Sequence, residues 1–374
     1  MRKIGIYTHW NVPNYGTFLQ AYALQKVLEN IFKSDDIYQI AYAEKSHLDL
    51  YYGIISAART RSHLFLINPK FYLLAFKSLL RIKEIKRTKK FIMYYKDIKN
   101  TGELTNQEFL NTSFDYVFVG SDIIWDFSRT IYKMDKRFFG IGLNTKEVIS
   151  YAASFGSVKK GIQVPEYVIN GLNKMKHVSV RDEKSAKLVK QITGKYGTIV
   201  IDPTFLWDFW DDNNIPIRPV DFKYIIVYGS YFTKKNITEV IKYAKEHNLK
   251  IICLDSLRDH FNWCDITITQ DKLHPFLWCS YLKHAEVVMT CTYHGLIFSL
   301  IYKKRIVMNP LPFIMDKASS FIDFLGLTQV LTEEGSFKEK ADWDWDYSKI
   351  DNRIEELKEK SLSFIQNVII EDDE

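Results

Sequence analysis

Short apolar strands alternate with amphipathic helices along most of this chain, and this alternation restricts the fold more than any other feature. The first strand and helix are predicted at residues 3–8 and 17–32, and the pattern resumes with a strand at 223–228 and a helix at 238–246. Strands joined through helices in this way form parallel βαβ units, in which helices cover a parallel sheet. The sequence therefore predicts an α/β fold.

Chain length and one irregular stretch predict two domains. The chain has 374 residues, which is more than one ordinary domain contains. Residues 207–219 are rich in Asp, Asn and Pro and interrupt the periodicity, so we interpret them as a linker. This places an N-terminal domain at 1–208, with a basic helical insertion at about 48–100, and a C-terminal domain at 220–374, which ends in a helix at about 350–370.

The remaining predicted elements follow the same pattern. Strands are predicted at 37–43, 116–119, 147–152, 177–180, 197–201, 250–254, 286–289 and 306–308. Helices are predicted at 165–175, 182–193 and 275–282.

Positive charge is concentrated in the insertion. The formal net charge is +6, but residues 51–100 alone hold twelve Lys or Arg and two acids. A solvated helical face and a peripheral membrane contact through residues 59–99 both fit a basic segment that also contains Phe, Leu and Tyr. No nucleic-acid motif accompanies the charge, so a nucleic-acid partner is not expected.

The spacing of the cysteines and the length of the apolar runs indicate the cellular compartment of the protein. The four cysteines, at 253, 264, 279 and 291, include no C-x-x-C pair, so we expect neither a metal site nor a disulfide scaffold. No apolar run approaches the roughly 20 residues that span a bilayer. The first residues read as a strand rather than a signal peptide. We therefore expect a cytoplasmic protein, with membrane contact limited to the inner face of the cell membrane.

The segment 286–300 is the most informative for chemistry. An apolar strand runs directly into Thr292-Tyr293-His294-Gly295, where a helix pattern begins. Unpaired N–H groups at such a helix start bind anions, and a histidine there can also transfer a proton near neutral pH. The alternative is a histidine that caps a core helix.

Three loops in the first half also follow predicted strands, and parallel strands bring such loops to one edge of a sheet. Ordinary turn and capping chemistry is the alternative for each loop. No G-x-G-x-x-G is present, so a dinucleotide fingerprint is absent. The candidate binding residues in the first two loops are Asn14, Tyr15, Gly16, Gln20, Ser121, Asp122 and Trp125. The third loop is Ala153-Ser154-Phe155-Gly156.

Two cations complete the candidate site. Arg181 follows the strand at 177–180, where its guanidinium could bind a carboxylate or phosphate through two parallel hydrogen bonds. The alternative is a salt bridge with Asp182 or Glu183. Lys317, in a predicted loop at 315–318, could add a second positive charge or be an exposed loop lysine.

These segments, in this order, resemble the polysaccharide pyruvyl transferase family over about residues 3–330. The resemblance rests on six motifs in register, none of them decisive alone. They are Asn14-Tyr15-Gly16-x-x-Leu19-Gln20 after the first strand, Gly120-Ser121-Asp122-x-x-Trp125, Ala153-Ser154-Phe155-Gly156, Ser179-Val180-Arg181-Asp182-x-x-Ser185, Asp202-Pro203-Thr204 and Thr292-Tyr293-His294-Gly295-x-x-x-Ser299.

The resemblance implies a fold and a reaction. It implies two Rossmann-like domains facing across a cleft, as in glycosyltransferases of the B type. It also implies transfer from phosphoenolpyruvate to a sugar diol on a surface polysaccharide or lipid-linked glycan, which forms a pyruvate ketal. Phosphoenolpyruvate is then a co-substrate, with no further cofactor and no metal. Some members of the family carry an arginine at the position of Thr292, so Lys317 could supply the missing charge here.

The resemblance also suggests roles for individual residues. Arg181 and His294 are expected to bind the donor, together with Thr292, Tyr293, Gly295 and Lys317. His294 would hold the phosphate and relay a proton, Arg181 would clamp an anionic group, and Asp122 would bind or deprotonate the acceptor. Two other functions remain: a nucleotide-sugar-dependent glycosyltransferase of the same architecture, and a non-catalytic glycan-binding protein.

Overall fold

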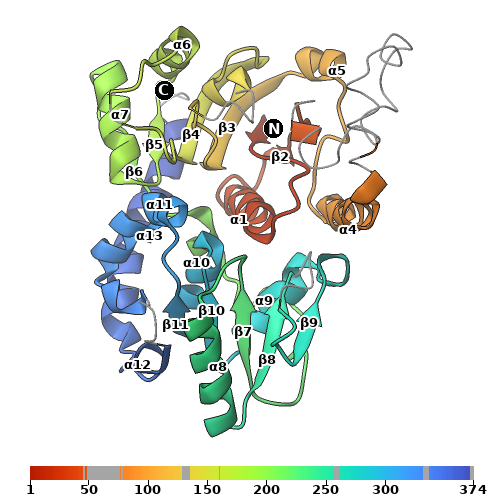
Figure 1. The fold of residues 1–374 in the computed structure, drawn as a ribbon. Coiled ribbons are helices and arrows are strands. Elements are labelled where there is room, and N and C mark those ends of the chain that lie inside the picture. Colours follow the sequence, from red (N-terminus) through yellow and green to blue (C-terminus); the bar gives the residue numbers. More distant parts are fainter. Residues whose placement is uncertain are drawn as a thin grey trace. The chain divides into compact units, whose positions relative to one another are not determined.

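The chain forms two units, each built around its own parallel sheet (Figure 1). The structure is a computed structural model, and it describes residues 1–44, 47–48, 76, 79–128, 135–159, 161–255, 261–331 and 337–370. Unit 1 contains Met1–Ile199 and unit 2 contains Val200–Ile370. The prediction of an α/β chain with two Rossmann-like domains is therefore confirmed.

The sheet of unit 1 has the strand order β2-β1-β3-β4-β5-β6, and every pairing in it is parallel. The chain moves from β1 to β2 on one side and then crosses to β3 on the other, so the direction of winding reverses between β1 and β3. Ligands of open α/β sheets bind outside the carboxyl ends of the strands at this kind of reversal. The strands are β1 Lys3–Tyr7, β2 Asp36–Gln39, β3 Phe114–Asp122, β4 Thr145–Ala153, β5 Val178–Val180 and β6 Thr198–Ile199.

Apolar side chains on both faces of this sheet explain its burial. Val117 and Val119 of β3 join one hydrophobic cluster with residues from α6 and α7. Tyr116 and Phe118 alternate with them and are also buried, because neighbouring strand residues point to opposite faces. The helices are α1 Tyr15–Ile31, α4 Ile82–Ile92, α5 Asn106–Asn111, α6 Glu166–Lys174 and α7 Glu183–Thr193, with the 3-10 turns η3 Met93–Asp97 and η5 Lys136–Phe139.

The sheet of unit 2 has the order β11-β10-β7-β8-β9 and is also entirely parallel. Its winding reverses between β7 and β10. The strands are β7 Tyr224–Tyr228, β8 Lys250–Leu254, β9 Ile266–Ile268, β10 Val287–Thr290 and β11 Arg305–Met308.

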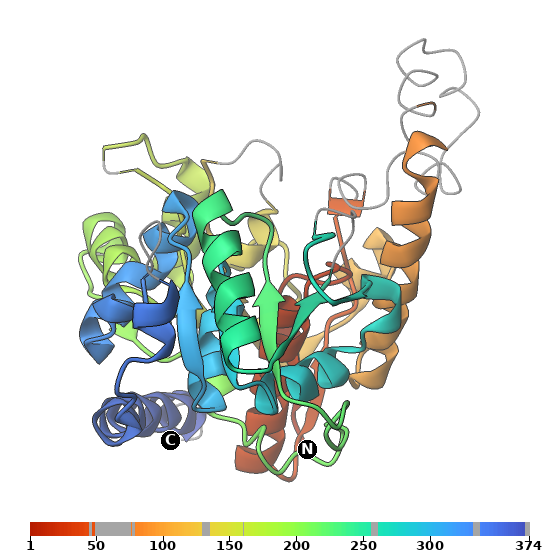
Figure 2. The same ribbon diagram turned by 60° about the horizontal axis from the view of Figure 1, so that its bottom comes forward.

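Helices cover both faces of the second sheet. Val307 of β11 packs in one cluster with α8 and α12, whereas its neighbours Ile306 and Met308 pack in another with α10, α11 and α13. Figure 2 shows α8 lying in front of the strands. The helices are α8 Lys234–Glu246, α9 Pro275–Lys283, α10 Tyr293–Ile301, α11 Pro312–Leu325, α12 Phe337–Ala341 and α13 Tyr347–Ile370, with the 3-10 turns η6 Pro203–Phe205, η7 Gln270–Lys272 and η8 Thr328–Val330.

The division between the units lies earlier than the sequence predicts. It falls after Ile199, so residues 207–219, interpreted above as a linker, belong to unit 2. Phe209 is fully buried against Phe298, and the Trp210 indole donates to the Ile301 carbonyl at 2.9 Å. Aromatic side chains therefore anchor a stretch whose polar composition alone resembles a linker.

Two further predictions need correction. Strand β9 and helices α5, α11 and α12 were not expected, and Lys317 lies within α11 rather than in a loop. Most of the basic insertion at 48–100 lies outside the described residues; the described part includes α4 and η3. Within the described chain, no helix is both long enough and apolar enough to cross a membrane.

Candidate active site

Polar side chains bridge β1 and β3 of unit 1 where the winding of the sheet reverses. Gln20, in the second turn of α1, accepts hydrogen bonds from the Ser121 amide at 3.1 Å and the Ser121 hydroxyl at 2.7 Å. Its amide nitrogen donates to the Thr8 hydroxyl at 3.1 Å, and Thr8 in turn donates to the Ser121 carbonyl. All three side chains are buried. This network fixes the position of the loop that follows β3.

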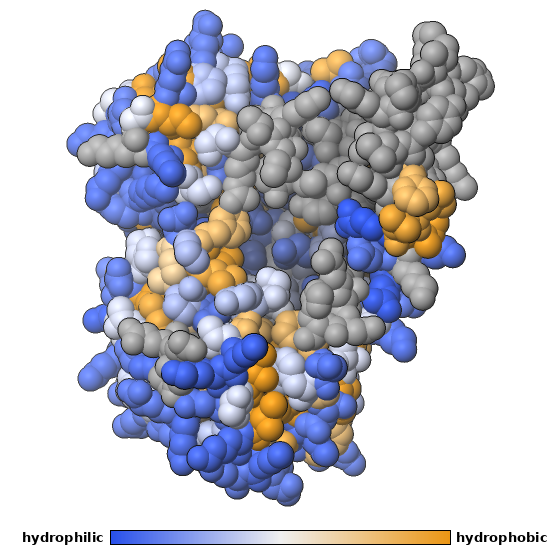
Figure 3. Space-filling view, in the orientation of Figure 1, coloured by the Kyte–Doolittle hydropathy of each residue, from blue (hydrophilic) through white to orange (hydrophobic). Residues whose placement is uncertain are grey.

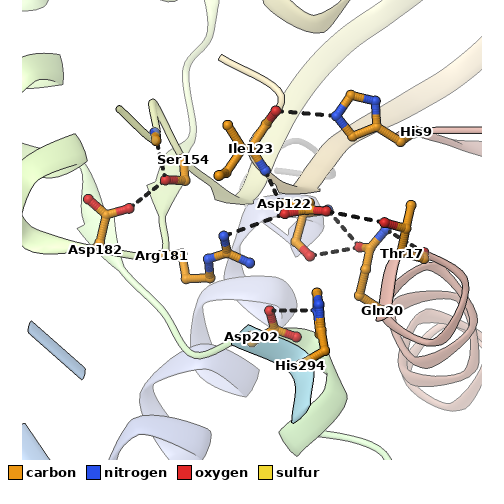
Figure 4. Close-up of polar contacts among 12 residues, drawn as sticks. His9, Thr17, Gln20, Asp122, Ile123, Ser154, Arg181, Asp182, Asp202 and His294 are labelled. Atoms are coloured by element: carbon orange, nitrogen blue, oxygen red, sulfur yellow. Dashed lines mark hydrogen bonds and ion pairs between the residues drawn. The ribbon is translucent and has the colours of Figure 1, made fainter. Parts of the chain in front are cut away.

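Asp122 ends β3 and is held from several directions (Figure 4). Its carboxylate accepts from the Ile123 amide at 2.8 Å and from the Thr17 hydroxyl at 3.4 Å. The Arg181 guanidinium lies 3.5 Å from Asp122 Oδ1. Asp122 and Arg181, which the sequence predicts as separate candidate residues, therefore form one ion pair within unit 1.

Arg181 is positioned by the turn between β5 and α7. Its backbone amide donates to the Ala153 carbonyl, and its side chain is almost wholly buried. The next residue, Asp182, caps α7 by accepting from the Ser185 amide at 2.7 Å and also accepts from the Ser154 hydroxyl at 2.7 Å. The predicted third loop thus supports the turn that carries Arg181.

Burial changes how four predicted acceptor-binding residues can act. The side chains of Tyr15, Gln20, Ser121 and Trp125 are fully buried. The Trp125 indole donates to the Phe138 carbonyl at 2.8 Å and its ring lies against Phe139 and Phe155. These side chains hold the loops in place and do not lie at the surface. Direct contact with an acceptor, which the sequence predicts for all four, does not fit this placement.

The start of α1 explains Asn14 and Gly16. The exposed Asn14 side chain caps α1 by accepting from the Thr17 amide at 3.1 Å. Gly16 lies buried in the first turn of that helix. Both residues therefore have a structural role, and Asn14 remains accessible at the end of the helix.

His9 is a candidate residue that the sequence interpretation missed. It follows β1 directly, and its Nε2 lies 3.2 Å from the Ile123 carbonyl, so it spans from the β1 loop to the β3 loop. Its ring lies 5.5 Å from that of His47 and 5.3 Å from that of Phe138. Burial, with a smaller effect of His9, lowers the pKa of His47 to about 4, so His47 is neutral near pH 7. Its position directly after the strand predicted at residues 3–8 could have identified His9 as a candidate from the sequence.

A buried charged cluster lies next to His9 at the end of β1. The Tyr7 hydroxyl donates to Asp135, and Arg137 pairs with both Asp135 and Glu44. Burial raises the pKa of the Asp135 carboxyl and raises that of Tyr7 well above its usual value. Phe138 contacts both Tyr7 and His9, so this cluster supports the residues at the winding reversal.

The turn between β10 and α10 forms the corresponding site in unit 2. The Thr290 hydroxyl donates to the Tyr228 carbonyl at 2.8 Å, which joins the ends of β10 and β7. The Thr292 hydroxyl caps α10 by accepting from the Gly295 amide at 3.0 Å. A Cβ at Gly295 would overlap Thr290 Oγ1 and lie 2.6 Å from Thr292 Oγ1. Thr292 therefore fills the capping position, and Gly295 allows the close packing that the cap requires.

His294 lies in the first turn of α10, beside a carboxylate. Its Nε2 is 3.9 Å from Asp202 Oδ2, and both side chains are buried. The other Asp202 oxygen accepts from the Thr204 amide at 3.1 Å and the Thr204 hydroxyl at 2.8 Å, so the carboxylate is fixed. The His294 imidazole therefore lies beside a carboxylate that Thr204 holds in position.

The remaining donor-site predictions have mixed placements. Tyr293 is buried against the ring of His294. The Lys317 ammonium lies 3.9 Å from the centre of the Phe313 ring on α11. Within the described part of the chain, no group of three or more His, Cys, Asp or Glu side chains is arranged to hold a metal ion.

Comparisons with known proteins agree with this architecture. A family model described as polysaccharide pyruvyl transferase matches residues 14–308. No curated protein matches the sequence. Among solved structures, the UDP-GlcNAc 2-epimerase of Methanocaldococcus jannaschii is similar, with a TM-score of 0.50, 11% identity and 99% of each chain covered. An S. aureus MnaA–UDP co-structure gives a TM-score of 0.48 at 14% identity, covering 96% of this chain and 91% of that one. At 11% identity, the likeness to the epimerase concerns the fold alone.

Proposed function

The chain belongs to the polysaccharide pyruvyl transferase family, whose model matches residues 14–308, and from this premise we propose that its donor is phosphoenolpyruvate. The family makes the chain a transferase enzyme that acts on polysaccharide. In the proposed reaction, the enolpyruvyl group moves to two hydroxyls of a sugar in a surface polysaccharide or lipid-linked glycan. The products are a pyruvate ketal and inorganic phosphate.

The placement of His294 is the observation on which the proposal depends. Phosphoenolpyruvate carries a phosphate and a carboxylate, so its site needs N–H donors and cations at fixed positions. The first turn of α10 offers backbone N–H groups at a helix start. His294 adds an imidazole that can bind a phosphate oxygen and exchange a proton, and the Asp202 carboxylate lies 3.9 Å from its Nε2.

The proposed chemistry balances without a redox step. A general acid protonates the methylene carbon of the donor, and one sugar hydroxyl attacks C2. The second hydroxyl then bonds to C2 as the bond from C2 to the phosphate oxygen breaks. Of the two hydroxyl protons, one is accounted for by the new methyl group and the other by the released phosphate. We assign the proton transfer at the donor to His294, because imidazoles are effective acids and bases near neutral pH.

Residues of unit 1 take the complementary roles in this proposal. Arg181 supplies a positive charge for the donor, and Asp122 binds the acceptor. Because Asp122 is already engaged by Arg181, Thr17 and Ile123, we assign the removal of the acceptor proton to His9. When His9 Nε2 donates to the Ile123 carbonyl, its Nδ1 is left as the proton acceptor in the neutral ring.

We also propose a co-substrate and a location for the enzyme. Phosphoenolpyruvate acts as a co-substrate, and no step requires a metal or another cofactor. A lipid-linked acceptor would place the enzyme at the inner face of the cell membrane. Peripheral contact through the basic segment 59–99 is consistent with that location.

Ligand-dependent melting tests the donor. At 100-fold excess over its dissociation constant, a bound ligand stabilises the folded protein by about 2.7 kcal/mol. We expect phosphoenolpyruvate to raise the melting temperature and UDP-N-acetylglucosamine to leave it unchanged. The reverse result would favour a nucleotide-sugar-dependent glycosyltransferase.

Phosphate release tests the reaction itself. We expect release from phosphoenolpyruvate only when a sugar diol is present, measured across a panel of glycans and lipid-linked sugars. Release that does not depend on any acceptor, or no release with any of them, would count against pyruvyl transfer. Glycan binding without release would instead indicate a non-catalytic binding protein.

A further inference from the structure

Helix α4 presents one outward face on which apolar and basic residues are combined. Ile82, Lys86, Lys89 and Met93 are spaced at i, i+4, i+7 and i+11, which places them on one side of a helix, and all four are exposed. On the other side, Ile85, Thr88 and Phe91 are buried. The Phe91 ring meets Tyr15 of α1 at 5.0 Å. The helix is therefore fixed to unit 1 by one face and leaves the other available.

The apolar part of this face is larger than isolated surface residues explain. Ile82 and Met93 on this face are 40% and 58% exposed, and Leu79 and Leu80, which precede the helix, are exposed as well. In Figure 3 a cluster of apolar atoms lies over α4, beside hydrophilic ones. Clustered exposed apolar side chains on a soluble protein indicate an interaction surface.

The basic part of the face is not neutralised by nearby acids. Arg81 pairs with Glu84, and Lys99 pairs with Asp36. Within the described part of the chain, no carboxylate lies within ion-pair distance of Lys86, Lys89 or Lys90. We call Leu79, Leu80, Ile82, Met93 and these three lysines the α4 mixed face. Its net charge is positive, so its partner is expected to be an anion.

We propose that the α4 mixed face binds the surface of an anionic lipid bilayer. Lysines attract the negatively charged headgroups, and their aliphatic stems leave the ammonium groups at headgroup level. The leucine, isoleucine and methionine side chains then enter the boundary between headgroups and acyl chains. Nucleic acid would satisfy the lysines but would give the apolar side chains no partner. The combination of both kinds of side chain on one face therefore favours a membrane.

This surface inference stands apart from the donor chemistry. Its link to a lipid-linked acceptor rests on the proposed function, but vesicle binding requires neither donor nor acceptor. If pyruvyl transfer fails and vesicle binding succeeds, the surface assignment remains. If transfer to a soluble acceptor succeeds and vesicle binding fails, only the membrane assignment is lost.

Vesicle flotation tests the proposal with the full-length chain. We expect it to float with phosphatidylcholine–phosphatidylglycerol vesicles and to remain unbound with phosphatidylcholine alone. Binding should weaken as salt is raised, because exposed charges are screened. Lys86→Gln/Lys89→Gln/Lys90→Gln should weaken binding roughly 100-fold, at about fivefold per lysine near an anionic surface. Ile82→Gln/Met93→Gln should also weaken binding, and the residual binding should depend more strongly on salt.

A matched triple variant separates local from overall charge. Lys174→Gln/Lys190→Gln/Lys195→Gln removes three exposed lysines from the α6–α7 region of the same unit, two of them in last turns of helices as Lys89 and Lys90 are. We expect this control to bind vesicles like the parent. Equal loss in both triple variants would overturn the proposal. A failure to bind anionic vesicles would also overturn it. The same holds if the chain binds duplex DNA as tightly as anionic vesicles and Ile82→Gln/Met93→Gln leaves that DNA binding unchanged.

Discussion

Asp122 shows how the partners of a residue change the chemistry that its type suggests. A carboxylate after a strand is a reasonable general base when only the sequence is known. In the folded unit its oxygens already accept hydrogen bonds from Ile123 and Thr17 and pair with Arg181. His294, by contrast, lies beside a carboxylate that is itself held by Thr204. That environment suits an imidazole that gains and loses a proton.

The pairing of His294 with Asp202 leads to a prediction for turnover. We expect His294→Gln to lower kcat by about 10²- to 10⁴-fold, the usual contribution of a general acid or base. Asp202→Asn keeps the acceptor for Thr204 but loses the charge, so its loss should be smaller. If Asp202 acts through His294, the double variant should lose no more than His294→Gln alone. Steady-state turnover with phosphoenolpyruvate and a diol measures this, and unchanged turnover in His294→Gln would remove the assigned role.

Close packing at Gly295 leads to a prediction for stability. A Cβ there would overlap Thr290 Oγ1, so Gly295→Ala should force the turn apart and lower the free energy of unfolding by about 1–3 kcal/mol. Gly197→Ala is a matched control, since its Cβ would meet Val180 at an ordinary 3.5 Å. Urea unfolding of both variants measures the difference. Equal effects at the two positions would contradict the packing argument.

At the scale of elements, four polar residues of the six family motifs serve as helix caps. Asn14 caps α1, Asp182 caps α7, Asp202 caps η6 and Thr292 caps α10. Asn14 and Thr292 directly precede candidate site residues, and Asp182 directly follows Arg181. Capping and binding share a location because the unpaired N–H groups of a helix start attract both side-chain oxygens and anionic ligands. A residue that caps a helix and a residue that binds an anion are therefore expected in the same turns.

The buried cap of α7 should matter more than an exposed one. Asp182 accepts from two serines and a backbone amide inside the protein, so Asp182→Ala leaves buried donors unsatisfied. We expect it to lower the free energy of unfolding by about 2–3 kcal/mol. The exposed capping box at Thr105 and Glu108 gives the comparison, with Thr105→Ala costing about 1 kcal/mol. Chemical denaturation tests both, and a larger cost for Thr105→Ala would contradict this ranking.

At the scale of the whole molecule, the candidate residues are divided between the two units. Asp122, Arg181 and His9 belong to unit 1, and His294 and Asp202 belong to unit 2. His9 and Asp122 lie at the ends of β1 and β3, between which the winding of the first sheet reverses, and His294 follows β10, which takes part in the reversal of the second sheet. The proposed donor requires both Arg181 and His294.

Hydrogen exchange tests that requirement directly. We expect phosphoenolpyruvate to slow amide exchange both at residues 293–296 in α10 and at residues 180–183 around Arg181. Exchange at the exposed α5 serves as an internal control and should not change. Protection confined to one unit would show that Arg181 and His294 do not share the donor.

Sequence periodicity was sufficient for most of the fold, because it is a local property. Ten of the strands and the parallel sense of both sheets follow from apolar runs interrupted by helices. The short β9 and the helices α5, α11 and α12 were missed, and the stretch around Phe209 was interpreted as a linker. Motifs in register predicted the family, since they mark the turns at which strands end.

What the sequence by itself determined was the class of fold, the family and the turns that carry polar residues. Only the tertiary structure decided which of those residues meet. His294 and Asp202 are brought together within unit 2, His9 reaches Ile123, and Trp125 turns into the core. The physical reason is that hydrophobic periodicity depends on neighbours along the chain. Contacts between distant side chains depend instead on strand order, which sets the loops that share an edge of the sheet.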